Sequence, residues 1–372
     1  MVNMKQIILN NYIKLNEYLK NNNINNIFIV CLGIIKDLEI YKILENNENI
    51  KKTYFTNFKP NPTYESVCEG LNYFKKSQSK FIIAIGGGSA LDVAKCIKLF
   101  SNLNSNKNYL EQEYKNNDIE LMAIPTTAGT GSEATRYAVI YHQGIKQSIT
   151  HDSIIPSIVL FDDNILNTLP LYQKKATFLD ALSHAIESFW SINSTKESKD
   201  YSKKSIELII NNYREYLKEN KDVFNNMLMA ANLSGKAINI TQTTAGHAMC
   251  YKLTSLYGIS HGHAAALVNS LLLPYMIENT KKCIDSRGEE YLKEVFYELT
   301  TILHLKNLDE LKKYLENLLN ELDLYNVNVS NNDIDELTKS VNPTRLKNNP
   351  VELDEEGIKK IYQKLFKKIE KR

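Results

Sequence analysis

The sequence predicts two domains: an α/β domain over residues 1–165 and an all-helical domain over residues 166–372. In the first half, short apolar segments alternate with helical patterns, as they do in a parallel sheet that has helices on both faces. After about Leu166, long helical patterns follow one another and few strand signals interrupt them. The length of 372 residues also exceeds the usual size of a single hydrophobic core.

The strands expected in the first half are short apolar runs that end at turn residues. The run Phe81–Ile85 is continuously apolar, which is typical of a strand buried on both faces. The expected strands are Asn26–Cys31, Lys52–Phe58, Phe81–Ile85, Leu121–Pro125 and Ser157–Asp162. The helices expected between them are Asp37–Leu44, Tyr64–Lys76 and Leu91–Phe100. This alternation predicts a mainly parallel, doubly wound sheet.

The second half is expected to be helical because its apolar residues recur at a helical period. The expected helices are Lys175–Trp190, Ser198–Glu219, Val223–Asn239, Ala264–Asn279, Glu289–Leu305, Leu308–Leu322, Asp333–Ser340 and Asp354–Lys368. Polar loops are expected at Asn326–Asn332 and Asn342–Asn349.

Composition limits the classes of partner. The formal net charge is +2, from 45 basic and 43 acidic side chains, which is too balanced to suggest a nucleic acid or a membrane surface. No apolar run approaches the roughly 18 residues that a membrane helix needs. The five cysteines are scattered and form no CxxC pair, so reduced thiols in a cytoplasm are the simplest interpretation. We therefore expect a cytoplasmic protein that acts on small molecules.

Two glycine-rich loops follow neighbouring strands. Gly86-Gly87-Gly88-Ser89 opens a helix, where backbone amides and the positive end of the helix dipole can bind a phosphate. Thr126–Glu133 adds hydroxyls and glycines at the end of the next strand, where open α/β sheets bind ligands. An ordinary tight turn is the alternative for each loop. Two such loops together favour a dinucleotide, although no G-x-G-x-x-G fingerprint is present.

Four side chains could close around one divalent metal. Asp180 and His184 are four residues apart and share one face of a predicted helix. His247 and His261 lie in a segment of small and apolar residues. A helix-surface hydrogen bond and two core histidines are the alternative. One carboxylate and neutral imidazoles suit Fe²⁺ or Zn²⁺, either of which polarises a carbonyl for attack by hydride from a dinucleotide.

These motifs together resemble the iron-dependent (group III) alcohol dehydrogenase family. The resemblance rests on Gly86–Lys95, Pro125–Glu133, Asp180–Glu187 and Pro60–Thr63, which occur in the family's order. It implies a dehydroquinate synthase-like fold with a cleft between the domains, and a homodimer or larger assembly. By this resemblance the metal ligands are Asp180, His184, His247 and His261, with iron favoured over zinc. The contacts to NADH or NADPH are Asn61, Gly87, Gly88, Ser89, Asp92, Thr126, Thr127, Thr135, Lys146 and Leu169.

The sequence departs from the family in three places, and the first two concern cofactor choice and proton transfer. Many members have an acidic residue after the first strand that binds the adenosine ribose. Here Cys31-Leu32-Gly33 has no carboxylate, which weakens the case for strict NAD specificity and leaves NADPH open. Many members also carry a proton-relaying histidine where Tyr251 stands here. With an unperturbed pKa of about 10, a phenol is a poor base at neutral pH, so His263 and solvent are the alternatives.

The third departure is the segment Thr243–Gly258, which together with Glu187–Ser194 looks like the phosphonoacetaldehyde reductase branch of the family. A phosphonate needs a fixed cation and hydroxyl donors near the metal, which Lys252, Thr243, Thr244 and Arg136 could supply. The expected reaction reduces phosphonoacetaldehyde to 2-hydroxyethylphosphonate. The alternatives are a general alcohol, 1,3-propanediol or lactaldehyde dehydrogenase, a dehydroquinate synthase-like lyase and, least favoured, a structural protein.

Overall fold

The computed structural model describes residues 6–162 and 164–371 and divides the chain into two compact units. The first unit comprises Met1–Leu169 and Glu219–Leu228, and the second comprises Pro170–Lys218 and Met229–Arg372. The first unit therefore gives way to the second after Leu169, whereas the boundary expected from the sequence lies at residue 165. No sequence pattern set Glu219–Leu228 apart from its neighbours.

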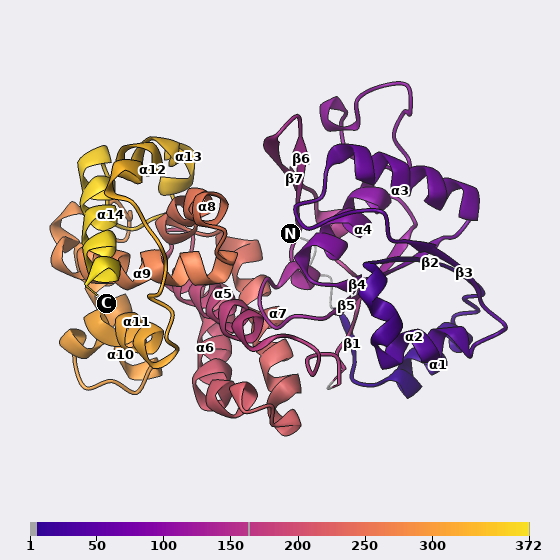
Figure 1. Ribbon diagram of the computed structural model, residues 1–372, viewed down its shortest axis with the longest axis horizontal. Coiled ribbons are helices and arrows are strands. Elements are labelled where there is room, and N and C mark those ends of the chain that lie inside the picture. Colours follow the sequence, from indigo (N-terminus) through magenta and orange to yellow (C-terminus); the bar gives the residue numbers. More distant parts are fainter. Residues whose placement is uncertain (1–5, 163, 372) are drawn as a thin grey trace. The chain divides into compact units, whose positions relative to one another are not determined.

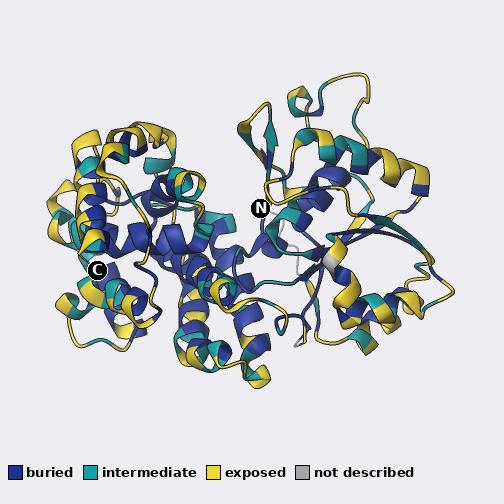
Figure 2. Cartoon of the chain, in the orientation of Figure 1, coloured by how far each residue is buried: buried dark blue, intermediate teal, exposed yellow. Residues whose placement is uncertain are grey.

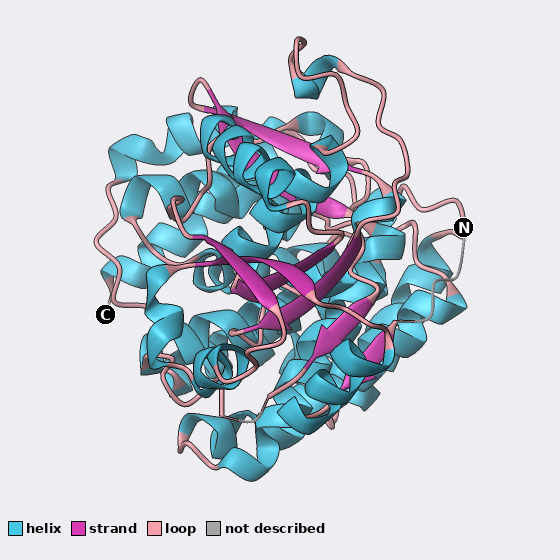
Figure 3. Ribbon diagram, turned by 90° about the vertical axis from the view of Figure 1, so that its right-hand side faces the viewer, coloured by secondary structure: helices cyan, strands magenta, loops and turns pink. Residues whose placement is uncertain are grey.

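The first unit contains one parallel sheet. Its described strands lie in the order β1-β8-β5-β4-β2-β3, and every neighbouring pair is parallel. Their bounds are β1 Ile7–Leu9, β2 Asn26–Cys31, β3 Lys51–Phe55, β4 Phe81–Gly86, β5 Glu120–Pro125 and β8 Ile158–Leu160. The strands twist from one edge of the sheet to the other (Figure 3). The expected doubly wound sheet is confirmed, and β1 was missed because it is only three residues long.

The strand order reverses between β2 and β4. The chain runs from β2 outward to β3 and then returns to β4 on the other side of β2. The carboxyl ends of β2 and β4, at Cys31 and Gly86, therefore flank the point where an open α/β sheet characteristically binds its ligand.

Helices cover both faces of the sheet (Figure 1). They are α1 Tyr12–Asn21, α2 Glu39–Glu45, α3 Tyr64–Ser77 and α4 Gly88–Phe100. Phe28 on β2 and Ile82 on β4 pack with Leu71 on α3 and Leu91 on α4 in one buried core. A hairpin of β6 (Tyr137–His142) and β7 (Ile145–Thr150) also packs on α4. This hairpin was not expected from the sequence because Gln143-Gly144, with φ of 53° and 76°, is not a common turn pair.

The second unit is helical, as expected. Its helices are α5 Leu171–Trp190, α6 Lys196–Leu217, α7 Phe224–Thr241 (which begins in the first unit), α8 Ala245–Tyr257, α9 His261–Glu278, α10 Glu289–Ile302, α11 Leu308–Glu321, α12 Ile334–Ser340, α13 Pro343–Leu346 and α14 Glu355–Glu370. Helix α9 is apolar on all sides and packs against α5, α8, α11 and α14. It is accordingly buried along most of its length (Figure 2). Among the described residues, no helix combines the length and apolar character that crossing a membrane requires.

Helix α8 was missing from the sequence prediction. Its first residues, Ala245 and Gly246, follow two threonines, and this segment of small and apolar residues was not among the helices expected from the sequence. Because α8 carries His247, the missed helix is part of the candidate site.

Candidate functional site

Three helices of the second unit bring candidate metal ligands together. Asp180 on α5, His247 on α8 and His261 on α9 each offer one ligand atom, and these atoms all lie within 4.8 Å of one another. Asp180 and His247 are 3% and 1% exposed. Buried carboxylate and imidazole groups that converge in this way suit a divalent metal.

His184 lies against the same cluster. It follows Asp180 by one helical turn, and its Nε2 is 4.0 Å from Asp180 Oδ1. Its ring stacks on that of His247, with the ring centroids 4.4 Å apart. This contact is compatible with a fourth ligand, and that role of His184 stays a prediction.

Glu187 orients His247, a role that the sequence analysis did not assign. The Glu187 side chain is fully buried, and its Oε1 lies 2.6 Å from His247 Nδ1. A carboxylate only accepts hydrogen bonds, so Nδ1 holds the proton and Nε2 faces Asp180 Oδ1 at 3.4 Å. Asn269 donates to Oε1, and the Thr244 amide and hydroxyl donate to Oε2. Carboxylates that orient ligand histidines in this way are typical of metal sites.

Charge balance within the cluster changes the pKa values of its members. Burial alone would raise the pKa of Asp180, but His184, His261 and His247 outweigh it and lower that pKa. Burial would also raise the pKa of Glu187, yet its bonds to His247 and other donors lower it to about 2. Both carboxylates are therefore ionised at neutral pH.

Two glycines permit the close helix contacts on which this cluster depends. A Cβ on Gly262 would lie 2.1 Å from the Ala176 carbonyl oxygen and 2.5 Å from Asp180 Cβ. Helix α9 can therefore approach α5 closely enough to bring His261 beside Asp180. A Cβ on Gly246 would lie 2.5 Å from Glu187 Oε1, so this glycine leaves room for the carboxylate that orients His247.

The three residues predicted for proton transfer and substrate binding lie in different surroundings. Half-buried Tyr251 stacks on His261, with centroids 5.2 Å apart, and burial raises the pKa of its phenol, which makes it a poorer base still. Lys252 forms a 2.6 Å ion pair with Glu336 at the surface. His263 is 3% exposed and hydrogen-bonded at both ring nitrogens, to Tyr172 and to the Leu324 carbonyl. These contacts favour surface and packing roles for Lys252 and His263.

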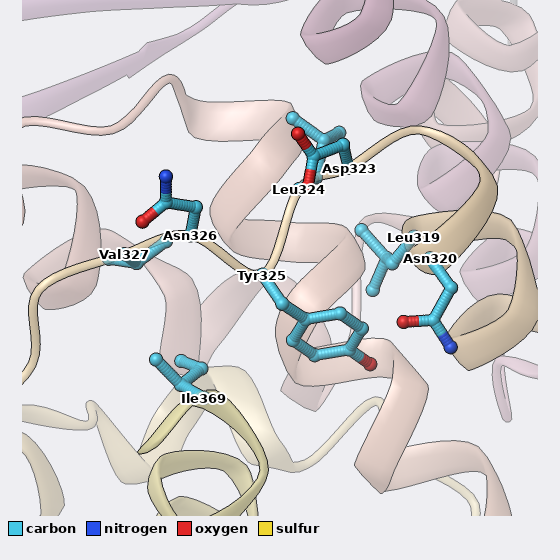
Figure 4. A pocket seen from close by; sticks show the side chains of 8 residues that line it. All are labelled: Leu319, Asn320, Asp323, Leu324, Tyr325, Asn326, Val327 and Ile369. Carbon is cyan, nitrogen blue, oxygen red and sulfur yellow. The ribbon is translucent and has the colours of Figure 1, made fainter. Parts of the chain in front are cut away.

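A pocket of about 280 Å³ lies near the segment that binds His263 (Figure 4). It is lined by Leu319, Asn320, Asp323, Leu324, Tyr325, Asn326, Val327 and Ile369. None of the candidate metal ligands lines this pocket, so we give it no part in the chemistry.

The two glycine-rich loops of the first unit lie side by side, as the sequence predicted. Gly86 pairs with Pro125, and the amide of Thr126 donates to the Gly86 carbonyl at 3.1 Å. Helix α4 begins at Gly88 directly after β4. An added Cβ on Gly87 would lie 3.4 Å from Thr127 Cγ2, and one on Gly88 would lie 3.3 Å from Thr130 Cγ2. The two loops thus gather backbone amides and hydroxyls at the carboxyl ends of β4 and β5, next to the point between β2 and β4 where the strand order reverses.

The other predicted cofactor residues divide into two groups. Asp92 accepts hydrogen bonds from Ser132 and the Val139 amide, and buried Thr135 accepts one from Lys95, so both hold the second loop in place. The remaining predicted residues are partly or fully exposed: Asn61, Ser89, Lys146 on β7 and Leu169. Their cofactor contacts stay predictions. Arg136, proposed as a phosphonate donor, forms an ion pair with Asp152.

Comparison with known proteins agrees with this architecture. Residues 7–163 match the model for iron-containing alcohol dehydrogenase, and residues 174–366 match the C-terminal model of the same family. Alcohol dehydrogenase 4 of Saccharomyces cerevisiae is 31% identical over 278 residues, which cover 73% of this chain and 71% of that protein. 1,3-Propanediol dehydrogenase of Klebsiella pneumoniae is 32% identical over 267 residues, 68% of each chain.

Solved structures share the fold along nearly the whole chain. An iron-containing alcohol dehydrogenase from Thermococcus thioreducens aligns with a TM-score of 0.87 at 21% identity, covering 99% of this chain and 100% of that one. Sulfoacetaldehyde reductase from Bifidobacterium kashiwanohense, solved with NAD⁺, aligns with a TM-score of 0.84 at 24% identity, covering 97% and 96%. This chain therefore belongs to the iron-containing alcohol dehydrogenase family, an oxidoreductase family that uses iron and NAD(P).

Proposed function

We propose that this member of the family reduces phosphonoacetaldehyde to 2-hydroxyethylphosphonate. One NAD(P)H gives a hydride to the carbonyl carbon, one proton adds to the carbonyl oxygen, and NAD(P)⁺ is released. Asp180, His247 and His261, with His184 beside them, are the residues that would hold iron, and their convergence is the observation that carries the proposal. Bound iron would polarise the aldehyde carbonyl as a Lewis acid.

The chain's own residues prepare the site for this reaction. Glu187 fixes the His247 ring through Nδ1, and its network with Thr244 and Asn269 leaves little freedom for rotation. The glycine-rich loops of the first unit would bind the pyrophosphate of the dinucleotide through backbone amides. The Tyr251 phenol stays protonated at neutral pH because burial raises its pKa, so it can donate but not accept the transferred proton.

The choice of substrate rests on the two segments that resemble the phosphonoacetaldehyde reductase branch. Both segments contribute to the surroundings of the metal ligands. Glu187 and Trp190 come from the first segment, and Thr244 comes from the second. Trp190 Nε1 donates to the Thr244 hydroxyl at 2.9 Å, and that hydroxyl donates to Glu187 at 2.8 Å. The branch-like residues therefore support the ligand geometry directly.

A general dehydrogenase for small alcohols is the second candidate. It is favoured by relatives such as the 1,3-propanediol dehydrogenase, which is 32% identical over 68% of this chain. A neutral substrate would need no fixed cation beside the metal.

The deciding experiment compares substrates on iron-reconstituted protein under anaerobic conditions. Phosphonoacetaldehyde, propionaldehyde and lactaldehyde are each reduced with NADH and with NADPH. The proposal expects kcat/KM for the phosphonate to be at least about a hundredfold above the other two. Comparable values for all three aldehydes would instead favour the general dehydrogenase.

A further inference from the structure

Arg345 differs from the other described arginines in having no carboxylate partner. Arg136, Arg214 and Arg287 form ion pairs with Asp152, Glu321 and Asp285, respectively. Half-buried Arg345 instead donates from Nη1 to the Tyr251 hydroxyl at 2.9 Å, and its guanidinium lies 5.0 Å from the centroid of that ring. A guanidinium has five N–H donors, so most of its capacity for hydrogen bonds to an anion remains.

The position of Arg345 is fixed relative to the candidate metal ligands. Tyr251, which it contacts, stacks on His261 with an interplanar angle of 25°. The Arg345 guanidinium and the ring of the candidate ligand His261 thus both contact the side chain of Tyr251. Asn348, three residues further along, donates to the Thr243 carbonyl at 3.2 Å and anchors this loop to the start of α8.

We propose that Arg345 binds the anionic group of the substrate. This inference rests on the proposed function, since it assumes that the candidate ligands hold iron and that an aldehyde reacts there. A phosphonate or sulfonate presents two oxygens that match the planar fork of a guanidinium. In a two-carbon aldehyde the anion is only two bonds from the carbonyl carbon. The cation must therefore stand close to the metal ligands, and Arg345 meets this need through its contact with Tyr251, which stacks on His261.

Lys252, the cation that the sequence suggested for this role, is less suited to it. Lys252 is neighbour to Tyr251 in the sequence, but its ammonium group already pairs with Glu336 at 2.6 Å, and its side chain is 34% exposed. An anionic substrate would have to compete with that carboxylate in contact with water. Arg345 therefore replaces Lys252 as the residue expected to select an anionic aldehyde.

The test compares Arg345→Leu with Arg214→Leu, a matched change in the same unit that breaks the ion pair with Glu321. Both variants and the parent protein are reconstituted with iron and assayed with phosphonoacetaldehyde, sulfoacetaldehyde and propionaldehyde. For Arg345→Leu, the ratio of kcat/KM for phosphonoacetaldehyde to that for propionaldehyde should fall at least about 30-fold. Arg214→Leu should leave this ratio within about twofold. The sulfoacetaldehyde assay shows whether a phosphonate or a sulfonate is preferred.

A binding measurement independent of turnover completes the test. Methylphosphonate carries the anion without a carbonyl, and it should raise the melting temperature of the parent protein and of Arg214→Leu but not that of Arg345→Leu. Arg345→Lys should keep part of this shift, which controls for a folding defect in the leucine variant.

Two results would overturn the role of Arg345. The first is an equal loss of activity on the phosphonate and on propionaldehyde in Arg345→Leu. The second is a Tyr251→Phe variant that reproduces the Arg345→Leu selectivity, because Arg345 would then act through the phenol. If the parent protein shows no preference for either anionic aldehyde, the substrate proposal itself fails, and so does this inference. If the parent protein prefers an anionic aldehyde and the Arg345→Leu variant keeps that preference, only the role of Arg345 is contradicted.

Discussion

The glycine-rich loops of the first unit and the candidate metal-ligand cluster of the second differ in how far apart their parts lie in the sequence. Each loop is one contiguous segment that follows directly from a strand, and β4 and β5 are adjacent in the sheet. The metal-ligand cluster draws Asp180, His247 and His261 from three helices, across more than eighty residues of sequence. Its geometry depends on helix packing that no single segment specifies.

This difference indicates where each site should be sensitive to mutation. The loops are proposed to bind the dinucleotide through backbone amides, so bulk added to the glycines should affect the dinucleotide alone. The candidate cluster is proposed to bind the metal through side chains supported by buried partners, so loss of a ligand or of Glu187 should affect the metal alone. The predictions below test this separation, beginning with the largest expected effect.

Asp180→Asn should abolish iron binding because it removes the anionic ligand of the cluster while keeping its shape. We expect kcat/KM for any aldehyde to fall by at least about 10³-fold. Iron content per chain after anaerobic reconstitution measures the cause, and exposed Asp200→Asn on α6 is the matched control. The affinity for NADH should change by less than about twofold. A parallel loss of NADH binding would show that the two sites are not separable.

Glu187→Gln should weaken iron binding without abolishing it. The amide keeps the size of the side chain but loses the charge that holds His247 Nδ1–H, at 2.6 Å in the structure. Loss of such a supporting partner typically costs about 10- to 100-fold in metal affinity. Competition with a chelator measures this affinity, and exposed Glu197→Gln serves as the control. Unchanged affinity would mean that the Glu187 network serves only packing.

The same difference between contiguous and dispersed segments explains which parts of the fold and of the site could be predicted from the sequence. The parallel sheet, the helical second half and the loops could be predicted because each depends on local periodicity or on one contiguous turn. Glu187 was missed as a supporting residue, although it follows Asp180 by seven residues and therefore shares a helix face with it and His184. Arg345 could not be found, because its contact with Tyr251 joins residues 94 positions apart. Helix α8 was missed because its small residues, including Gly246, allow close packing but give a weak helical signal.

Gly88→Val should weaken binding of NAD(P)H and leave the iron content unchanged. The new side chain would crowd Thr130, whose Cγ2 is 3.3 Å from an added Cβ, and would hinder the approach of a pyrophosphate to the start of α4. We expect the KM for the dinucleotide to rise about 10-fold. Gly88→Ala, which adds only the Cβ, should have a smaller effect. Equal effects of the two substitutions would count against steric crowding as the cause.

Leu32→Asp should shift dinucleotide preference toward NADH by about five- to tenfold. Leu32 directly follows β2, whose carboxyl end flanks the strand-order reversal, and a carboxylate there can accept hydrogen bonds from ribose hydroxyls. The same charge repels the 2′-phosphate of NADPH, which is why the ratio of the two kcat/KM values should change most. Exposed Asn25→Asp adds a carboxylate before the amino end of the same strand and should not alter the ratio. If Leu32→Asp leaves the ratio unchanged, the adenosine ribose does not lie at this end of β2, and the absence of an acidic residue there says nothing about cofactor choice.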